Sequence, residues 1–264
     1  MTATKGPGMP EAALDEDLAF ARHLAQVASE LSLEYLQRGV TAQLKPDGSP
    51  VTNADVEVER RLRQLIAEHR PGDGVLGEEL GETGSVERRW VLDPIDGTRN
   101  FVEHRPLWGN HIALEVAGEI VVGVITRPVL GSSWWARRGG GAHRTDSPPS
   151  PGERRLSVSA LRSLRSGRVS LWMYEPDPVL EQRVTRHCQC VEPSLDSLLR
   201  LAEGHLEALV DSSGRPWDLA PAVVLVEEAG GRYSDRAGGR RLDLGGGRFS
   251  NGHVHSELEE LLSG

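Results

Sequence analysis

Cysteine is scarce in this sequence. Cys188 and Cys190 are the 2 cysteines among 264 residues, and their i, i+2 spacing would point them to opposite faces of a strand. Such a pair is poorly placed for a disulfide, and protein thiols stay reduced in the cytoplasm. We therefore expect a cytoplasmic protein whose fold does not depend on disulfide bonds.

Long apolar runs are absent as well. The opening segment, MTATKGPGMPEAALDED, has no apolar stretch of the kind that a signal peptide needs. Nowhere do about 18 apolar residues follow one another, which is roughly the minimum for a membrane-spanning helix. We expect neither export nor insertion into a membrane.

Positive charge is in deficit. The formal net charge is -9 and the isoelectric point is about 5.5. Nucleic acids and anionic membranes bind basic surfaces, so the composition argues against both as partners. Any anionic ligand must be attracted by local positive charge or by a bound cation.

The chain does have enough apolar residues, 38%, to bury a core. Apolar residues recur at helical spacing over 15–37 and 56–70, and apolar runs or alternations predict strands elsewhere. These strands are expected at 88–93, 111–118, 119–129 and 132–138. Helical and strand patterns that alternate without a short repeat predict a layered α/β protein.

A Ser/Pro-rich stretch at 145–151 divides the chain into two expected halves, 1–144 and 152–264. In the second half, strands are expected at 155–160 and 168–173, and a helix leading into a strand at 193–210. The segment WDLAPAVVLVEEAGG predicts a helix with Asp218 as its N-cap, Pro221 in its first turn, and Gly230 or Gly231 at its end.

The segment WVLDPIDGTRNF carries the clearest chemical signal. Asp93 follows an apolar strand that Pro94 is expected to end, so that Asp96 adds a second carboxylate to the same space. Two carboxylates this close repel each other unless a proton or a cation lies between them. Oxygen ligands favour Mg²⁺, and GTRNF can open a helix whose N–H groups face an anion. The letters DPIDG are also typical of a simple turn, and alone they do not decide the matter.

Further motifs flank this segment: LKPDGSPVTNAD, GEE at 77–79, GVITRPVL with WWARRGGGA, and WDLAPAVVLVEEAGG. Together they resemble the inositol-monophosphatase-like superfamily of Mg²⁺-dependent, lithium-sensitive phosphatases, over most of the chain from Phe20 to SNGHVHSEL. RPGDGVLGEE and WWARRGGGA look most like the bacterial histidinol-phosphate phosphatases of that superfamily. The resemblance implies a layered α/β/α/β/α sandwich of the inositol-monophosphatase/fructose-1,6-bisphosphatase type.

The resemblance also implies the ligands of two or three Mg²⁺ ions. Glu78, Asp93 and the carbonyl of Ile95 would hold the first ion, while Asp93, Asp96 and Asp218 would hold the second. Asp218 at a helix start suits this role, because the N–H groups behind it stabilise a carboxylate that keeps an oxygen free. Taken alone, Asp218 could be a plain N-cap and Glu78 a solvated acid in the run GEELGE.

The implied reaction is hydrolysis of a phosphate monoester by a metal-activated water. Glu78 and Thr98 would activate the water, and Asp47 would hold Thr98. The backbone N–H groups of Gly97 and Thr98 would bind phosphate oxygens. Lys45 would lie beside the phosphate or else be an exposed loop lysine.

The region that would select the leaving group departs from the family pattern. CVEPSLDS carries Pro-Ser where a glycine and a small or acidic residue are common. Glu192, Asp196 and Asp211 could pair with a substrate amine, as histidinol phosphate would offer, or could be solvated acids. Arg215 could instead favour a more anionic substrate.

The leading hypothesis is a Mg²⁺-dependent phosphatase of a small monoester, with histidinol phosphate first and inositol 1-phosphate second. One alternative is a nucleotide- or sugar-bisphosphate phosphatase, which would need a second basic pocket. Another is a non-catalytic binding relative, against which the intact acidic motifs argue. Homodimers are common in such families, and exposed apolar residues near Trp108 could form the interface.

Overall fold

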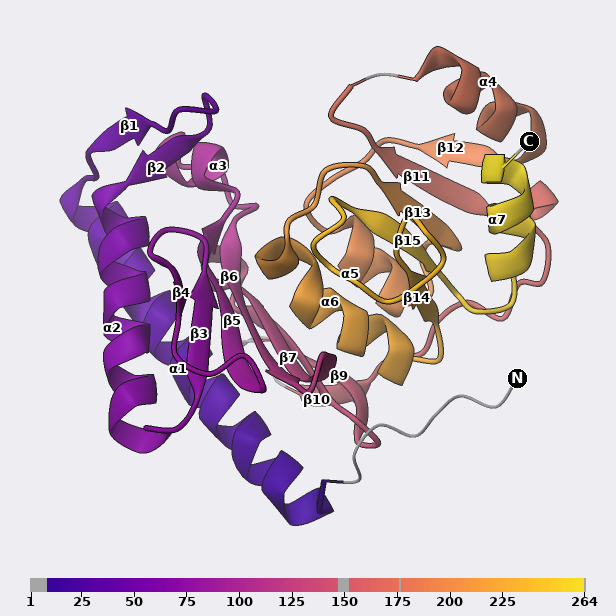
Figure 1. Ribbon diagram of the computed structural model, residues 1–264. Helices are drawn as coiled ribbons and strands as arrows, with labels where there is room; N and C mark the ends of the chain where they lie inside the picture. Colours follow the sequence, from indigo (N-terminus) through magenta and orange to yellow (C-terminus); the bar gives the residue numbers. More distant parts are fainter. Residues whose placement is uncertain (1–8, 147–151, 176, 264) are drawn as a thin grey trace.

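The computed structural model describes residues 9–146, 152–175 and 177–263, which form five layers (Figure 1). Helices α1 (Glu11–Arg38) and α2 (Asn53–His69) cover the outer face of an eight-stranded sheet. Helices α5 (Ser197–Ala202) and α6 (Pro216–Glu228) form a middle layer against a five-stranded sheet. Helices α4 (Pro178–His187) and α7 (His255–Ser263) pack on the far side of that sheet. The expected α/β/α/β/α sandwich is confirmed.

The eight-stranded sheet has the order β10-β9-β8-β7-β6-β5-β3-β4. Strands β3 and β5 run parallel, so their carboxyl ends meet at one edge of the sheet. The short helix α3 (Thr98–Val102) follows β5, and a hairpin of β1 (Ala42–Leu44) and β2 (Pro50–Thr52) stands beside α3 (Figure 1). The strands of this sheet are β3 (Gly74–Gly77), β4 (Gly81–Thr83), β5 (Arg88–Asp96), β6 (Gly109–Val116), β7 (Glu119–Arg127), β8 (Ser132–Arg137), β9 (Gly141–Asp146) and β10 (Gly152–Arg155).

The five-stranded sheet has the order β12-β11-β13-β15-β14 and mixes parallel with antiparallel pairs. Its strands are β11 (Arg168–Trp172), β12 (Gln189–Val191), β13 (Ala208–Asp211), β14 (Arg232–Ser234) and β15 (Gly247–Ser250). Short 3₁₀ turns occupy Pro128–Leu130 and Leu164–Ser166. Cys188 and Cys190 flank the start of β12 and are both free thiols, which confirms that they form no disulfide.

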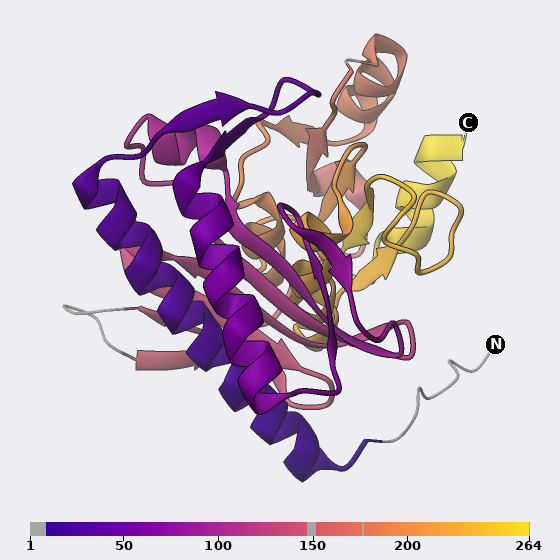
Figure 2. The same ribbon diagram turned by 60° about the vertical axis from the view of Figure 1, so that its left-hand side comes forward.

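The long amphipathic helices explain the outer layer. Phe20, Leu24 and Ala28 of α1 are buried together with Leu62 and Ile66 of α2, and both sets pack on Trp90 of β5. Figure 2 shows the two helices lying side by side across the sheet. Each helix therefore forms where its apolar stripe finds this sheet face. No helix of the described residues has the length and apolar character that a membrane crossing requires.

Three expectations about strands and boundaries differ from the structure. β5 continues through Pro94 to Asp96, because a register shift after Asp93 relieves the proline of a ladder hydrogen bond. The strand expected at 155–160 is wrong, since β10 ends at Arg155 and pairs with β9. Of the expected boundary at 145–151, residues 147–151 lie outside the described residues, and β10 beyond it belongs to the sheet of the first half.

The helix expected at 217–231 is present as α6, but its beginning differs. Pro216 is the first helical residue, so the N-cap is Arg215 and the expectation that Asp218 is the N-cap residue is wrong, although the Asp218 carboxylate accepts from the Arg215 backbone N–H at 2.7 Å. Asp218 lies in the first turn, and Pro221 lies beyond it inside the helix. The helix ends at Glu228 with Ala229 as its C-cap, and the expected glycine stop follows at Gly230, whose φ of +98° suits glycine.

Three tryptophans of the large sheet region belong to the core. Trp134 and Trp135 are only 4% and 3% exposed. Trp108 is 0% exposed and packs edge-on against Phe101, so Trp108 itself offers no exposed apolar surface, and the expected interface near it stays a prediction.

Helix α6 lies directly on β7 because Gly123 has no side chain. A Cβ at this position would come within 2.6 Å of the Pro221 carbonyl oxygen and of Val224 Cγ1. The helix that carries Asp218 is therefore held against the large sheet by a contact that only glycine permits.

Gly123→Val should lower the melting temperature, because the added methyl groups must push α6 off the sheet. Overpacking of this kind costs about 1–3 kcal/mol, which corresponds to roughly 2–10 °C in a chain of this size. Gly72→Val is the matched control, since a Cβ at Gly72 meets nothing within 4 Å. Equal melting temperatures for the two variants in differential scanning calorimetry would contradict this packing argument.

Candidate active site

The expected metal ligands come together at the carboxyl edge of the large sheet. Glu78 directly follows β3, and Asp93, Ile95 and Asp96 form the end of the parallel strand β5. Asp218 approaches from the first turn of α6, in the middle layer. The structure thus gathers acids that are far apart in the sequence.

A histidine that sequence reasoning missed completes this cluster. His111 of β6 lies opposite Asp93 in the sheet register. One ligand atom each from Asp93, Asp96 and His111 lie within 4.8 Å of one another, and His111 Nε2 is 3.3 Å from Asp96 Oδ2. In sequence His111 is only one residue of an apolar strand, and cross-strand register alone reveals its neighbours.

The carboxylates of the cluster outnumber the cations that contact them, which are Lys45 at Glu78 and Arg127 at 3.6 Å from Asp96 Oδ2. Asp93 is 2% exposed, and burial, followed by the charges of Glu78 and Asp96, raises the pKa of its carboxyl well above the usual range. Burial and the charge of Asp96 raise the pKa of Asp218 to about 8. Burial lowers the pKa of His111 to about 4, so the imidazole is neutral and does not offset these acids.

Asp96 Oδ2 is buried and accepts no hydrogen bond from the described residues. Crowded carboxylates, one of which has a buried oxygen without a hydrogen bond, and a neutral imidazole are a donor set that a divalent cation can bind, and the nearest cation to that oxygen is Arg127 at 3.6 Å. The residues present therefore fit a metal ion.

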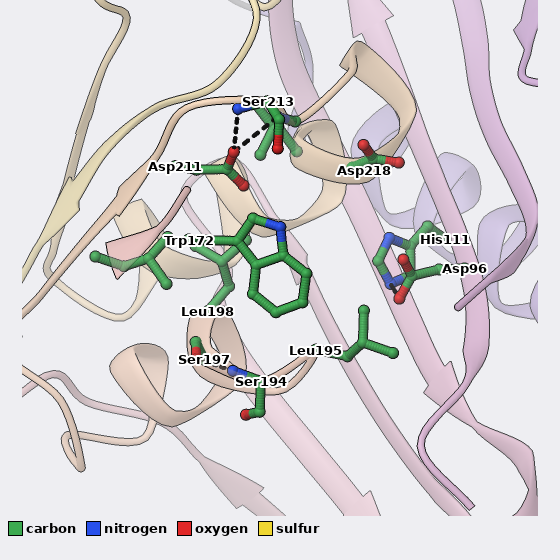
Figure 3. Close-up of a pocket in the computed structure, with 13 residues that line it drawn as sticks. Asp96, His111, Trp172, Ser194, Leu195, Ser197, Leu198, Asp211, Ser213 and Asp218 are labelled. Carbon is green, nitrogen blue, oxygen red and sulfur yellow. Dashed lines mark hydrogen bonds and ion pairs between the residues drawn. The ribbon is translucent and has the colours of Figure 1, made fainter. Parts of the chain in front are cut away.

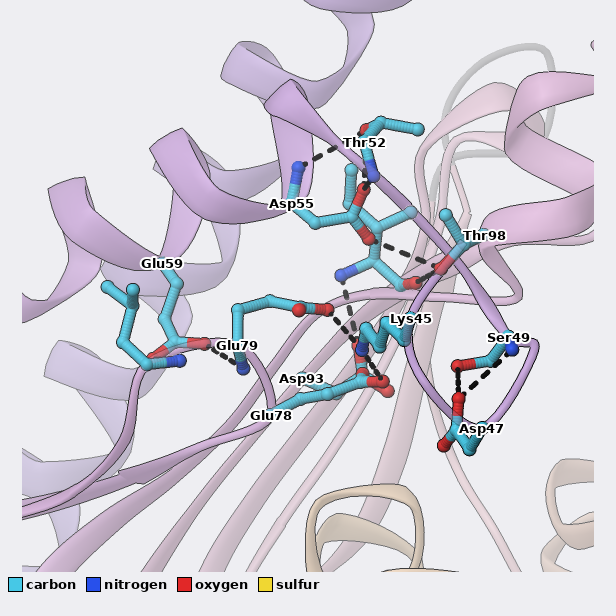
Figure 4. Close-up of polar contacts among 12 residues, drawn as sticks. Lys45, Asp47, Ser49, Thr52, Asp55, Glu59, Glu78, Glu79, Asp93 and Thr98 are labelled. Atoms are coloured by element: carbon cyan, nitrogen blue, oxygen red, sulfur yellow. Dashed lines mark hydrogen bonds and ion pairs between the residues drawn. The ribbon is translucent and has the colours of Figure 1, made fainter. Parts of the chain in front are cut away.

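Lys45 reaches this cluster from the β1–β2 hairpin, as Figure 4 shows. Its Nζ lies 2.7 Å from Glu78 Oε1 and 2.8 Å from Glu79 Oε1. Burial lowers the pKa of Lys45, but the bonds to Glu78 and Glu79 outweigh it and raise that pKa. Burial raises the pKa of Glu79 to about 7. Lys45 is therefore part of the site and not an exposed loop lysine.

Thr98 is held by Asp55 and not by Asp47, so the expected partner is wrong. The Thr98 hydroxyl lies 3.2 Å from Asp55 Oδ1 and 3.2 Å from the Ile95 carbonyl oxygen. Asp47 stays in the hairpin turn, where it accepts from the backbone N–H and the hydroxyl of Ser49 (Figure 4). Its side chain satisfies its own turn, which is what aspartate does in such loops.

Asp55 itself is fixed by the start of α2. The Asp55 carboxylate accepts from the Thr52 backbone N–H at 2.9 Å, and the Thr52 hydroxyl oxygen accepts from the Asp55 backbone N–H. Asp55 is 0% exposed. This is a capping box, and the spacing Thr-x-x-Asp in VTNAD could have located it in the sequence. Burial raises the pKa of Asp55, and the hydrogen bonds from Thr52 oppose that shift.

Glu59 is a second buried acid that sequence reasoning missed. Its carboxylate accepts from the backbone N–H groups of Glu79 and Leu80 at 2.8 and 3.2 Å. A Cβ on Gly77 would come within 2.0 Å of Glu59 Oε1, so glycine is needed where the loop passes. Glu59 thereby positions the loop that carries Glu78. Its signal in sequence was an acid one turn after Asp55, between the apolar positions Val58 and Leu62.

Gly97 and Thr98, expected to bind phosphate through their N–H groups, form the turn between β5 and α3. Gly97 has a φ of +82°, in the left-handed region that favours glycine. A side chain there would also come within 2.6 Å of Leu195 Cδ1. The turn beside Asp96 is thus compact, and its role toward phosphate stays a prediction.

A cavity of about 100 Å³ opens beside Asp96, His111 and Asp218. Figure 3 shows Trp172 across it and Asp211 at its rim. Asp211 Oδ1 accepts from the backbone N–H groups of Ser213 and Gly214 at 2.8 and 2.7 Å, and burial raises the pKa of its carboxyl.

The other acids considered for substrate contact lie elsewhere. Glu192 is exposed and belongs to a neighbouring groove together with Glu181 and Cys190. Asp196 accepts a hydrogen bond from Arg127 at 2.9 Å, so its charge is already paired. Of the acids weighed for an amine, Asp211 is therefore the one that lines the cavity.

The metal-free protein should become less stable as pH rises from about 6 to about 8.5. The raised pKa values of Asp93 and Asp218 mean that the folded state keeps protons which the unfolded chain releases near pH 4. Stability is therefore present at low pH and is lost as pH rises through the folded pKa. Excess Mg²⁺ should reverse this trend, because a cation binds the ionised carboxylates.

Thermal melts with EDTA and with Mg²⁺ across this pH range measure both trends. Asp218→Asn should flatten the slope in EDTA, whereas Asp243→Asn, at an exposed ion pair with Arg241, should leave it unchanged. A melting temperature in EDTA that is independent of pH would contradict the charge balance described above.

Comparison with known proteins agrees with this geometry. The family model described as inositol monophosphatase family matches residues 13–263. A histidinol-phosphatase from Mycobacterium tuberculosis is 38% identical over 252 residues, 92% of this chain and 96% of that protein. A Streptomyces griseus protein named glucose-1-phosphate thymidylyltransferase is 42% identical over 225 residues, 84% of this chain and 86% of that protein.

Solved structures give the same result for the fold. The extragenic suppressor protein suhB from Bartonella henselae superimposes with a TM-score of 0.81 at 27% identity, over 94% of this chain and 98% of that one. The acidic edge of β3 and β5 thus lies in a chain that matches the inositol monophosphatase family model and a relative named histidinol-phosphatase. The chain belongs to the inositol monophosphatase family and is a phosphoric monoester hydrolase.

Proposed function

We propose that this phosphatase is Mg²⁺-dependent and hydrolyses histidinol phosphate, with inositol 1-phosphate as the second candidate. The observation that carries the proposal is the unbalanced acidic cluster of Asp93, Asp96 and Asp218, beside a cavity that Asp211 also lines. A phosphate dianion can approach such a cluster only when cations neutralise it. The relative named histidinol-phosphatase supports the choice of substrate.

The proposed ligands divide into two sets. Glu78, Asp93 and the Ile95 carbonyl would hold one Mg²⁺, and Asp93, Asp96 and Asp218 would hold another. When bound, these ions supply positive charge for the phosphate and lower the pKa of a coordinated water. Ligands that are mostly oxygen favour Mg²⁺ over softer metals.

The residues of the chain then orient the attacking water. The Thr98 hydroxyl donates to Asp55, which leaves the Thr98 oxygen free to accept a hydrogen bond from the water. Glu78, held by Lys45, accepts the second hydrogen bond and takes that proton as the water attacks, so a lone pair of the water faces the phosphorus. The backbone N–H groups of Gly97 and Thr98 bind the phosphate oxygens in this proposal.

Asp211 would bind the amine of the leaving group. Its carboxylate is held by two backbone N–H groups and keeps a second oxygen for the cavity. Trp172 supplies an apolar wall beside it, suited to a flat ring. Glu192, which lies outside this lining, would reach only a longer substrate.

Two alternatives fit the cavity less well. A bisphosphate substrate needs a second basic pocket, and the described residues that line the cavity include no Lys or Arg. Nucleotidyl transfer, which the name of the Streptomyces griseus relative describes, would also bring a nucleoside triphosphate to a cavity whose described lining has no Lys or Arg.

A cytoplasmic location and a homodimer also belong to the proposal. Free Cys188 and Cys190 support a reducing compartment. Because Trp108 is buried, exposed Val129 and Leu130 are better candidates for a dimer interface.

Phosphate release should be strongest with histidinol phosphate and Mg²⁺, and EDTA should abolish it. Inositol 1-phosphate and adenosine 3',5'-bisphosphate are assayed separately as alternative substrates, and glucose 1-phosphate with thymidine triphosphate is assayed for release of pyrophosphate, the product of nucleotidyl transfer. Asp93→Asn should lower kcat by about 10³-fold or more, because this carboxylate would bridge both ions. Preferred release from another monoester would reject the substrate, and no release from any would reject the function.

Asp55→Asn should lower kcat by about 10²-fold, because the amide can donate to the Thr98 oxygen and so occupy the acceptor position that the water needs. Asp47→Asn is the matched control and should change kcat by less than about twofold, since its partners are in its own turn. Steady-state kinetics at saturating Mg²⁺ measure both. An equal loss in the two variants would refute the assignment of Asp55.

A further inference from the structure

Arg127, the last residue of β7, is a charged side chain with 0% exposure. Burying a guanidinium is unfavourable unless its donors find partners. Neither the metal ligands nor the proposed reaction require an arginine at this position. Its bonding partners therefore indicate what it does.

The guanidinium joins the two halves of the site. Nε donates to Asp196 Oδ1 at 2.9 Å, and Nη2 donates to the Leu195 carbonyl oxygen at 3.1 Å. On the other side, Nη2 lies 3.6 Å from Asp96 Oδ2, and Nη1 lies 3.4 Å from His111 Nε2. One rigid planar group thus contacts both the acidic cluster and the segment that precedes α5.

That segment forms part of the wall of the cavity. Ser194, Leu195 and Ser197 line it together with Asp96 and His111, and Figure 3 shows these residues around one space. Leu195 also lies so close to Gly97 that a Cβ there would come within 2.6 Å of its Cδ1. Any shift of this wall would therefore also displace the turn at Gly97, which is proposed to bind phosphate.

We propose that Arg127 is a positioning residue that ties the 194–197 wall to Asp96 and so sets both the fit of the leaving group and the binding of the metal. The part that concerns metal rests on the proposed function, in which Asp96 is a ligand. Arginine suits the task because its planar fork reaches several acceptors at fixed angles. Lysine, with a single ammonium, can satisfy one side only.

The test compares Arg127→Met, Arg127→Lys and Asp196→Asn with Arg144→Met. Arg144 is the matched control, because it also binds two carboxylates, those of Asp146 and Glu203, but away from the cavity. Hydrogen–deuterium exchange of peptides covering 193–199 measures how firmly the 194–197 wall is held. The rise of the melting temperature with Mg²⁺ concentration, without substrate, measures the binding of the metal. KM and kcat are measured with whichever monoester the wild type hydrolyses.

Asp196→Asn should speed exchange in 193–199 and raise KM by about tenfold. The Mg²⁺ concentration at the midpoint of the thermal shift (the Mg²⁺ midpoint) should change by less than about twofold. Both Arg127 variants should raise KM and the Mg²⁺ midpoint by about tenfold or more. Arg144→Met should lower the melting temperature without changing exchange in 193–199, KM or the Mg²⁺ midpoint.

A purely structural arginine gives a different pattern. If the Arg127 and Asp196 variants behave like Arg144→Met, the positioning role is overturned. Should Arg127→Met fail to fold, Asp196→Asn decides, because unchanged exchange and KM in that variant overturn the proposal equally. If the wild type binds no Mg²⁺ or hydrolyses no monoester, the proposed function fails, and exchange in 193–199 still decides whether Arg127 holds the wall.

Discussion

Repulsion among buried carboxylates is the constraint on which this structure depends. Asp93, Asp96 and Asp218 meet with Glu78 where two parallel strands end and helix α6 begins, and burial makes the charges of Asp93 and Asp218 unfavourable. Without metal, protons on the acids and the ammonium of Lys45 beside Glu78 reduce the repulsion between the carboxylates. A site built in this way has a strong preference for cations, which a phosphatase needs before it can admit a dianion.

The surroundings of the cluster keep the acids close despite their repulsion. Glu59 binds the backbone of the loop after β3, and the capping box of α2 holds Asp55 against Thr98. Gly123 lets α6 lie directly on the sheet, and this packing keeps Asp218 at the acidic cluster. Each of these supports acts through packing or backbone hydrogen bonds, and none requires the metal.

The local signals of the sequence predicted the elements well. Helical periodicity placed α1 and α2, and the apolar runs placed β5 to β8. The order of acidic motifs led to the family, because Asp93 and Asp96 are close in sequence and their spacing is a local property. The errors arose where a local pattern had two readings: Pro94 could end a strand or sit in a bulge, and Asp218 could cap a helix or follow its first residues.

Periodicity in the sequence by itself determined a layered α/β protein, and short motifs determined the resemblance to the phosphatase family, which implied the five layers and the metal role of the acids at the end of β5. Only the tertiary structure decided which distant residues complete the site. Cross-strand register brings His111 to Asp93, helix packing brings Asp55 to Thr98 in place of Asp47, and burial joins Arg127 to Asp196. Such partners depend on contacts between elements far apart in the chain, which no local pattern encodes.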